Sequence, residues 1–83
     1  MMRIELKQEL ESIIKNNMQQ AGFTCCLQEF EHGLCISWKR LNKNGSLTFF
    51  NNGRAGTSFQ TAYYSHLQGL KALRNMAAYS TPI

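Results

Sequence analysis

The spacing of hydrophobic residues changes twice along this chain, and each change marks a switch in secondary structure. Between residues 4 and 21 the apolar side chains recur every three or four residues, which is the period of one face of an α-helix. Between residues 23 and 50 they tend to alternate with polar side chains, as in strands with one buried face. The helical period returns between residues 58 and 78. The pattern therefore predicts a helix, a block of strands and a second helix.

The first helix is predicted over residues 4–21. Gly22 follows it, and a glycine at this position supplies the left-handed backbone conformation with which many helices end. Phe23 comes next, where a hydrophobic contact back to the helix usually accompanies such a cap. The apolar stripe of this helix consists of Leu6, Leu10, Ile13, Ile14, Met18 and Ala21.

Two turn signals divide the following segment into strands. Residues 31–33 (Glu-His-Gly) interrupt it first, and residues 42–45 (Asn-Lys-Asn-Gly) interrupt it again. Within the second signal, Asn44 and Gly45 supply the positive φ that a tight hairpin requires. Three strands are therefore predicted, over residues 23–30, 34–41 and 46–50.

Pairing across the second turn predicts the register of that hairpin. It places Trp38 opposite Phe49, so that two large apolar residues share one face. In the same register Arg40 lies opposite Leu47. The other sheet face is left open by the helices and is predicted to display Cys35, Ser37, Lys39, Thr48 and Phe50, together with Cys25, Leu27 and Glu29.

The second helix is predicted over residues 58–78. Thr57 and Gln60 have the spacing of a capping box at its start, and the glycine-containing segment 51–56 before it is expected to be a loop. A short tail, residues 79–83, follows the helix. The apolar stripe of the second helix consists of Phe59, Ala62, Tyr63, Leu67, Leu70, Leu73 and Ala77.

These elements predict an α+β fold with the order α-β-β-β-α. Three antiparallel strands would carry both helices on one face, because a single sheet of this size needs one covered face to form a core. A chain of 83 residues has room for one core only, so residues 1–83 are expected to form a single domain. The uncovered sheet face and the unprotected outer strands are candidate contact surfaces, including for a homodimer.

The charged residues are distributed unevenly along the chain. Residues 1–31 contain all five carboxylates and three basic residues, whereas residues 32–83 contain six basic residues and no carboxylate. An unopposed positive stretch favours an anionic partner, either nucleic acid or an acidic protein surface. The predicted binding residues are Lys39, Arg40, Lys43 and Arg54, gathered at one end of the sheet near the second hairpin, with Phe50 and Tyr64 as stacking surfaces and Lys71 on the last helix.

The order of elements is similar to that of double-stranded-RNA-binding domains. Those domains carry lysines at the start of their last helix, where the side chains straddle phosphates. The corresponding residues 56–60 of this chain contain no basic side chain, which argues against recognition of duplex RNA. A looser mode of nucleic-acid binding, through scattered cations and aromatic side chains, remains open.

The sequence offers little apparatus for catalysis or metal binding. Cys25, Cys26, His32 and Cys35 provide thiols and an imidazole around one turn, but paired zinc-ligand spacing is missing and adjacent strand residues point to opposite faces. The chain has no aspartate to orient either histidine. We therefore expect no enzymatic activity, no metal and no cofactor, and we interpret the cysteines as packing residues.

Two functions follow as hypotheses. The first is a small basic binding protein that docks on an anionic surface in a nucleic-acid-handling complex. The second is a protein-binding adaptor or inhibitor without nucleic-acid contact, of the kind that phages and plasmids carry to block a host or defence nuclease; an outward stripe of the last helix, with Tyr64 and Lys71, is its candidate contact. With three cysteines, no secretory signal and no membrane-length apolar run, the chain is expected to be cytoplasmic.

Overall fold

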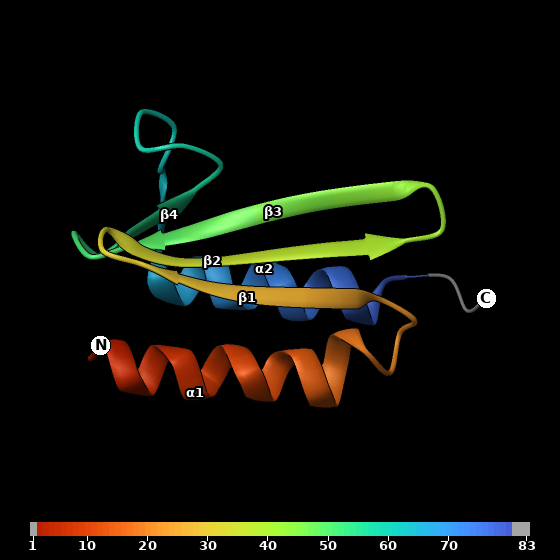
Figure 1. Ribbon diagram of the computed structural model, residues 1–83. Helices are drawn as coiled ribbons and strands as arrows, with labels where there is room; N and C mark the ends of the chain where they lie inside the picture. The colour runs from red at the N-terminus through yellow and green to blue at the C-terminus, as the bar shows by residue number, and fades with distance from the viewer. Residues whose placement is uncertain (1, 81–83) are drawn as a thin grey trace.

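Two helical segments cover one face of a five-stranded antiparallel sheet in the computed structural model, which describes residues 2–80 (Figure 1). The α+β class is confirmed, but the prediction of three strands is wrong. The strands follow one another across the sheet in chain order. The elements are α1 (Arg3–Ile13), a π-helical turn η1 (Ile14–Met18), β1 (Thr24–Phe30), β2 (Gly33–Arg40), β3 (Lys43–Phe50), β4 (Arg54–Gly56), β5 (Tyr64–Ser65) and α2 (His66–Ala78).

The first helical segment ends where its glycine predicts. The α-helix gives way to the π-helical turn η1, so the predicted helix over 4–21 is regular only in its first part. Gly22 then adopts a φ of 91°. The N–H of Phe23 donates to the carbonyl of Met18 at 3.0 Å, and the N–H of Gly22 donates to Gln19 at 3.1 Å. This pair of bonds is the Schellman motif, which satisfies carbonyls at the helix end.

The second hairpin turns earlier than predicted. Its two-residue turn is Leu41-Asn42, with Leu41 at a φ of 58°, and β3 already begins at Lys43. Trp38 therefore pairs with Gly45 and not with Phe49. The reason is steric, because a Cβ at Gly45 would lie 2.7 Å from Cζ2 of Trp38. The missing side chain leaves room for the indole.

The observed register also aligns the apolar residues better than the predicted one. Leu47 pairs with Ile36, and not with the predicted Arg40. Phe49 pairs with Leu34, and all four of these apolar side chains are buried against the helices. Burial of a complete apolar set outweighs the local turn preference of an Asn-Gly pair.

The first strand presents the opposite face from the one predicted. Cys25 pairs with Trp38 and Leu27 with Ile36, so both lie on the helix side of the sheet, partly buried against the core. Glu29 shares that side. The first turn contains only Glu31 and His32, and this two-residue connection sets which alternate residues of β1 face the helices.

The last helix begins eight residues later than predicted. Part of the expected loop pairs with the sheet instead, as β4, where Ala55 lies opposite Phe49. Residues 57–63 then form a loop, and the short strand β5 leads into α2. The capping box is made by Ser65 and Gln68, not by Thr57 and Gln60. Both sequences have the spacing of this motif, so spacing alone does not identify the cap.

The core lies between the helices and the helix-side face of the sheet. Every layer contributes to it, and it contains no buried polar or charged residue within residues 2–80. Tyr79 and Ser80 follow α2, while residues 81–83 of the predicted tail lie outside the described residues. No helix within residues 2–80 is both long and apolar enough to cross a membrane. The main buried side chains are Leu6, Leu10, Ile13, Met18, Phe23, Leu34, Ile36, Leu47, Phe49, Ala55, Leu70, Leu73 and Ala77.

Candidate binding surface

The sheet face turned away from the helices is a candidate binding surface, and we call its β1–β3 part the open face. Its members alternate with the buried residues along each strand, and the pairing register identifies them. Hydroxyl, amide and thiol groups dominate, with one ammonium group and no carboxylate. The open face consists of Thr24, Cys26, Gln28, Phe30, Cys35, Ser37, Lys39, Asn44, Ser46, Thr48 and Phe50.

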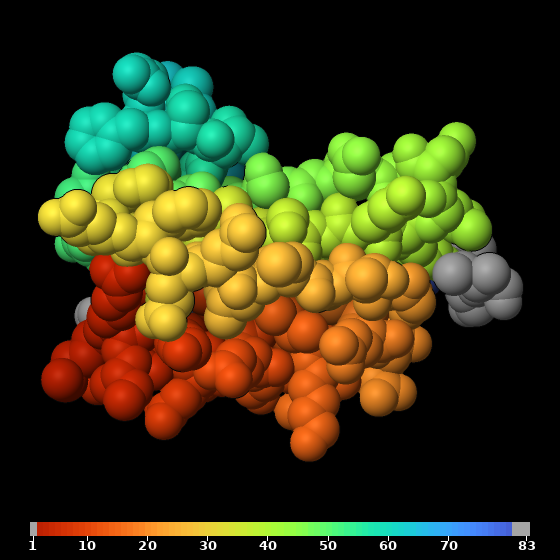
Figure 2. Space-filling view, in the orientation of Figure 1, coloured from red at the N-terminus to blue at the C-terminus, as the bar shows by residue number. Residues whose placement is uncertain are grey.

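A loop rises above one end of this face. Residues 57–63 project from the sheet beyond β3 and β4 in Figure 1, on the side opposite the helices. They form the protrusion at the upper left of Figure 2. Phe59, in this loop, is 65% exposed and meets the ring of Phe50 edge-on, with 5.5 Å between the ring centroids. Phe50 itself is only 6% exposed, so the prediction that it is an accessible stacking surface is wrong. It serves as the base on which the loop rests.

Four rings join at this end, and we call Phe30, His32, Phe50 and Phe59 the aromatic cluster. The rings of Phe30 and His32 are stacked, with centroids 5.3 Å apart and an interplanar angle of 11°. His32 in turn approaches Phe50, with centroids 5.8 Å apart. The exposed members belong to a turn, a strand end and a loop. Sequence reasoning missed this cluster because it assigned Phe59 to the apolar stripe of a helix.

Arg54 holds the loop in place. Its Nε donates to the carbonyl of Ala62 at 3.2 Å, and its Nη2 donates to the carbonyl of Tyr63 at 2.5 Å. Inside the loop the hydroxyl of Thr61 bonds to those of Thr57 and Ser58, at 3.1 and 2.8 Å. The guanidinium fork can satisfy two carbonyls at once, which a lysine cannot do. Arg54 therefore positions the aromatic residues of the loop as well as contributing charge.

The predicted cation cluster is divided by the fold. Lys39, Arg40 and Lys43 do lie together around the second hairpin. Arg54 lies at the other end of the sheet, because β4 pairs with the last residues of β3. Arg40 also turns away from the open face. Its Nε donates to the carbonyl of Ala21 at 2.9 Å, and its guanidinium lies over the ring of Phe23.

Lys39 borders a shallow hollow at the hairpin end of the open face. The hollow has a volume of ≈ 440 Å³. All of its lining residues belong to the three long strands, and none of them is acidic. We call it the Lys39 hollow; it is lined by Thr24, Cys25, Cys26, Ser37, Trp38, Lys39, Asn44, Gly45 and Ser46.

Four of the five carboxylates lie on the helical side of the molecule. Three of the five, Glu5, Glu9 and Glu11, belong to α1. Oε2 of Glu9 forms an ion pair with Nη2 of Arg74 in α2, at 2.7 Å. Oε2 of Glu29 forms one with Nζ of Lys7 in α1, at 3.2 Å. The remaining carboxylate, Glu31, belongs to the turn between β1 and β2, where Phe30 and His32 of the aromatic cluster flank it in the chain. The fold thus places most carboxylates on the helical side, whereas basic residues lie on both sides of the sheet.

The other predicted contact residues lie on the helical side or at its edge. Tyr64 is exposed, but it belongs to β5 and not to the last helix. Lys71 is exposed on α2, with Gln68 and Asn75. These side chains do not join the open face, so the predicted site residues form separate groups.

The thiols and imidazoles are dispersed. Cys25 faces Met18 on the helix side, with Sγ 3.9 Å from Sδ, and burial raises the pKa of its thiol. His66 lies at the start of α2, where Nε2 is 2.7 Å from the carbonyl of Phe50. In the part of the chain that the structure describes, no three His, Cys, Asp or Glu side chains lie close enough together to hold a metal ion.

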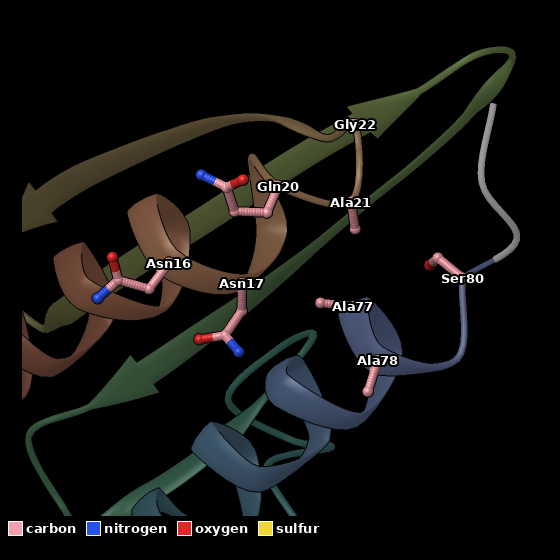
Figure 3. Close-up of a pocket in the computed structure, with 8 residues that line it drawn as sticks. All are labelled: Asn16, Asn17, Gln20, Ala21, Gly22, Ala77, Ala78 and Ser80. Carbon is pink, nitrogen blue, oxygen red and sulfur yellow. The ribbon is translucent and has the colours of Figure 1, made fainter.

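A second hollow, of ≈ 580 Å³, lies between the end of η1 and the end of α2 (Figure 3). Asn17 points from η1 toward α2 there, and Ala77 faces it. This hollow was not predicted. Its mixture of amide and methyl groups has no charged member, and the chain leads from its lining residue Ser80 into residues that the structure does not describe.

The comparisons with known proteins give no relatives: no family model, no curated protein and no solved structure matches this chain.

Proposed function

We propose that this protein is a non-enzymatic binding module whose open face docks on an anionic surface in a nucleic-acid-handling complex. The observation that carries the proposal is that the open face has no carboxylate. Basic side chains lie on both sides of the sheet, because Arg3, Lys7, Lys15, Lys71 and Arg74 belong to the helical segments. The open face contains Lys39 and no carboxylate, whereas the helical layer contains α1 with its three glutamates. An anionic partner therefore meets less repulsion on the open face than on any surface that includes α1.

Polar complementarity supports the same orientation. The hydroxyl and amide side chains of the open face are hydrogen-bond donors that suit phosphate or carboxylate oxygens. Lys39 supplies the charge at the hairpin end; Lys43, the first residue of β3, is exposed nearby but has the helix-side register of Arg40. A surface with so few cations binds an anionic partner weakly and in a salt-sensitive way. The aromatic cluster or a second binding component must therefore add affinity.

A specific observation favours a second candidate, a protein-binding adaptor or inhibitor. The loop over residues 57–63 exposes Phe59 and Tyr63, the latter by 74%, on a support built by Arg54 and Phe50. Exposed aromatic residues on a well-supported loop are typical anchors of protein interfaces. In this alternative the loop inserts into a partner and the open face forms the surrounding rim.

One experiment separates the two candidates. The tagged protein is used to capture partners from a cell lysate with and without nuclease, and the same capture is repeated with Lys39→Glu and with Lys15→Glu as the matched charge reversal on the helical side. The proposal expects Lys39→Glu to weaken capture and Lys15→Glu to leave it intact. Equal capture by wild type and Lys39→Glu contradicts docking through the open face. Capture that survives nuclease and Lys39→Glu but fails with Phe59→Ala supports the adaptor.

A further inference from the structure

We infer that the ligand of the open face is a single-stranded nucleic acid, with its backbone at the Lys39 hollow and its bases stacked on the aromatic cluster. This inference rests on the proposed function and names the ligand class of the same surface. It follows from the placement of a polar hollow with one lysine at one end of the open face and exposed rings at the other.

The chemistry of the Lys39 hollow suits a phosphodiester. The ammonium group of Lys39 can neutralise one phosphate, and the side chains of Ser37, Ser46 and Asn44 can donate hydrogen bonds to its oxygens. No carboxylate lines the hollow, so a phosphate meets no like charge there. At the other end of the face, Arg54 is exposed beside the loop and adds a second positive group.

The aromatic cluster favours unpaired bases over a duplex. Phe59 is 65% and Phe30 is 41% exposed, so both have ring surface available for stacking. Bases in a duplex already stack on one another, and they offer only their edges and phosphates to a protein. A single strand offers base faces, and base–aromatic stacking contributes about 1–3 kcal/mol per base, or roughly 5- to 150-fold in affinity.

The dimensions of the face fit a short strand. Six residue steps separate Gly33, beside the aromatic cluster, from Lys39 on β2. At about 3.3 Å per residue this is roughly 20 Å. Stacked nucleotides advance roughly 3.4 Å each, so the face accommodates about four to six of them. The loop over 57–63 then forms a wall against which the last base stacks.

The test uses fluorescence anisotropy with the full chain and three labelled probes of equal nucleotide number: oligo-dT, oligo-rU and a DNA duplex. We expect at least one single strand to bind about tenfold more tightly than the duplex at low salt. Phe59→Ala should weaken single-strand binding about 5- to 150-fold. Lys39→Gln should reduce the slope of log K against log salt concentration by about 0.7, the value of one phosphate contact.

Two variants on the helical side control for general effects. Tyr79→Ala removes an aromatic side chain that is 85% exposed, and Lys15→Gln removes an exposed cation; both should bind like the wild type. Circular dichroism establishes whether each variant is folded. If Phe59→Ala is not folded, Phe30→Ala repeats the aromatic test. Binding that responds to the controls as strongly as to Phe59→Ala overturns the inference.

The inference and the proposed function fail differently. If the duplex binds as tightly as the single strands, and only Lys39→Gln weakens it, stacking is excluded while docking on an anionic surface stands. If none of the probes binds and polyglutamate does not bind either, even at low salt, both are overturned.

Discussion

At the scale of single residues, the contact between Trp38 and Gly45 determines how the second hairpin is aligned. Because a Cβ at position 45 would lie 2.7 Å from the indole, Gly45→Ala must displace the ring or the strand. We expect the tryptophan emission to shift to longer wavelength and the free energy of unfolding to fall by about 1–3 kcal/mol. The chain has one tryptophan, so the spectrum reports this site alone. Ser46→Ala, on the adjacent exposed position, is the control, and an unchanged spectrum for Gly45→Ala would contradict the observed register.

Two adjacent cysteines differ in environment because strand residues alternate between faces. Cys26 is exposed on the open face, whereas Cys25 is partly buried and burial raises the pKa of its thiol. A raised pKa lowers the thiolate fraction at a given pH, and the thiolate is the reacting form. We therefore expect iodoacetamide to alkylate Cys26 before Cys25, and the rate at Cys25 to keep rising to a higher pH than that of an unhindered thiol. Peptide mass spectrometry of timed samples measures both rates; equal rates would place both thiols on the surface.

At the scale of secondary-structure elements, the start of α2 provides a matched pair of variants. Ser65 accepts a hydrogen bond from the N–H of Gln68 at 3.1 Å, and the Gln68 side chain accepts one from the N–H of Ser65 at 2.9 Å. Ser65→Ala should lower the free energy of unfolding by about 1 kcal/mol. Thr57→Ala, which removes the cap predicted from the sequence, should have a smaller effect. Chemical denaturation measures both, and the reverse order would mean that the helix starts at the earlier site.

Arg54 supports the loop over residues 57–63 through two carbonyls of that loop. Arg54→Lys keeps the charge but cannot reach both acceptors with the same geometry. We expect amide hydrogen exchange to accelerate within 57–63, while the core strands exchange as slowly as in the wild type. If the protein binds through the loop, Arg54→Lys should also weaken binding despite its unchanged charge. Unaltered exchange in the loop would show that the hydroxyl contacts of Thr61 are sufficient.

Local signals predicted the elements that local interactions determine. The Gly22 cap and the helical stripe through Leu70 and Leu73 agree with the structure. The first turn lies where it was predicted but is one residue shorter, which reverses the faces of β1. The second hairpin was misaligned because its register depends on which side chains are buried together, and the turn sequence favoured another solution. Strand β4 has three residues and no periodicity to detect, so the displaced start of α2 was not predictable from spacing.

In the candidate site, too, only the contacts between residues that are close in sequence were predictable. Lys39 and Lys43 are close in sequence on one hairpin, so their proximity followed from local pairing. The position of Arg54 depends on β4, and that of Phe59 depends on the loop that β4 and β5 support. Both errors have the same origin. The positions of both residues depend on contacts between segments that are distant in sequence, and no short-range pattern encodes such contacts.

At the scale of the whole molecule, the one-sided placement of most carboxylates and the one-sided core are two consequences of the same layering. Helices cover a single face, so the main hydrophobic core lies between the layers and most polar residues of the long strands lie on the other side. The ion pair of Glu9 with Arg74 joins α1 to α2, and the ion pair of Lys7 with Glu29 joins α1 to β1. Because these pairs are exposed, the apolar core contributes most of the stability.

A core shared by every layer predicts cooperative unfolding. Leu10 of α1 is fully buried, in one cluster with Ile36 of β2, Phe49 of β3 and Leu70 of α2. Leu10→Ala should therefore lower the free energy of unfolding by about 3–5 kcal/mol, through lost burial and the cavity that remains. The far-UV circular dichroism of the helices and the fluorescence of the tryptophan in β2 should shift together to the same lower midpoint, because neither layer has a core of its own.

The control for this variant lies on the same helix. Ile4 is an apolar residue of α1 that is 61% exposed, so Ile4→Ala removes the same class of side chain without opening a cavity and should leave both midpoints nearly unchanged. If Leu10→Ala instead shifted the helical signal and left the tryptophan transition in place, the sheet would be stable without α1. The open face would then be supported by β1–β3 and α2 alone, and α1 would act mainly as the element that keeps the carboxylates away from it.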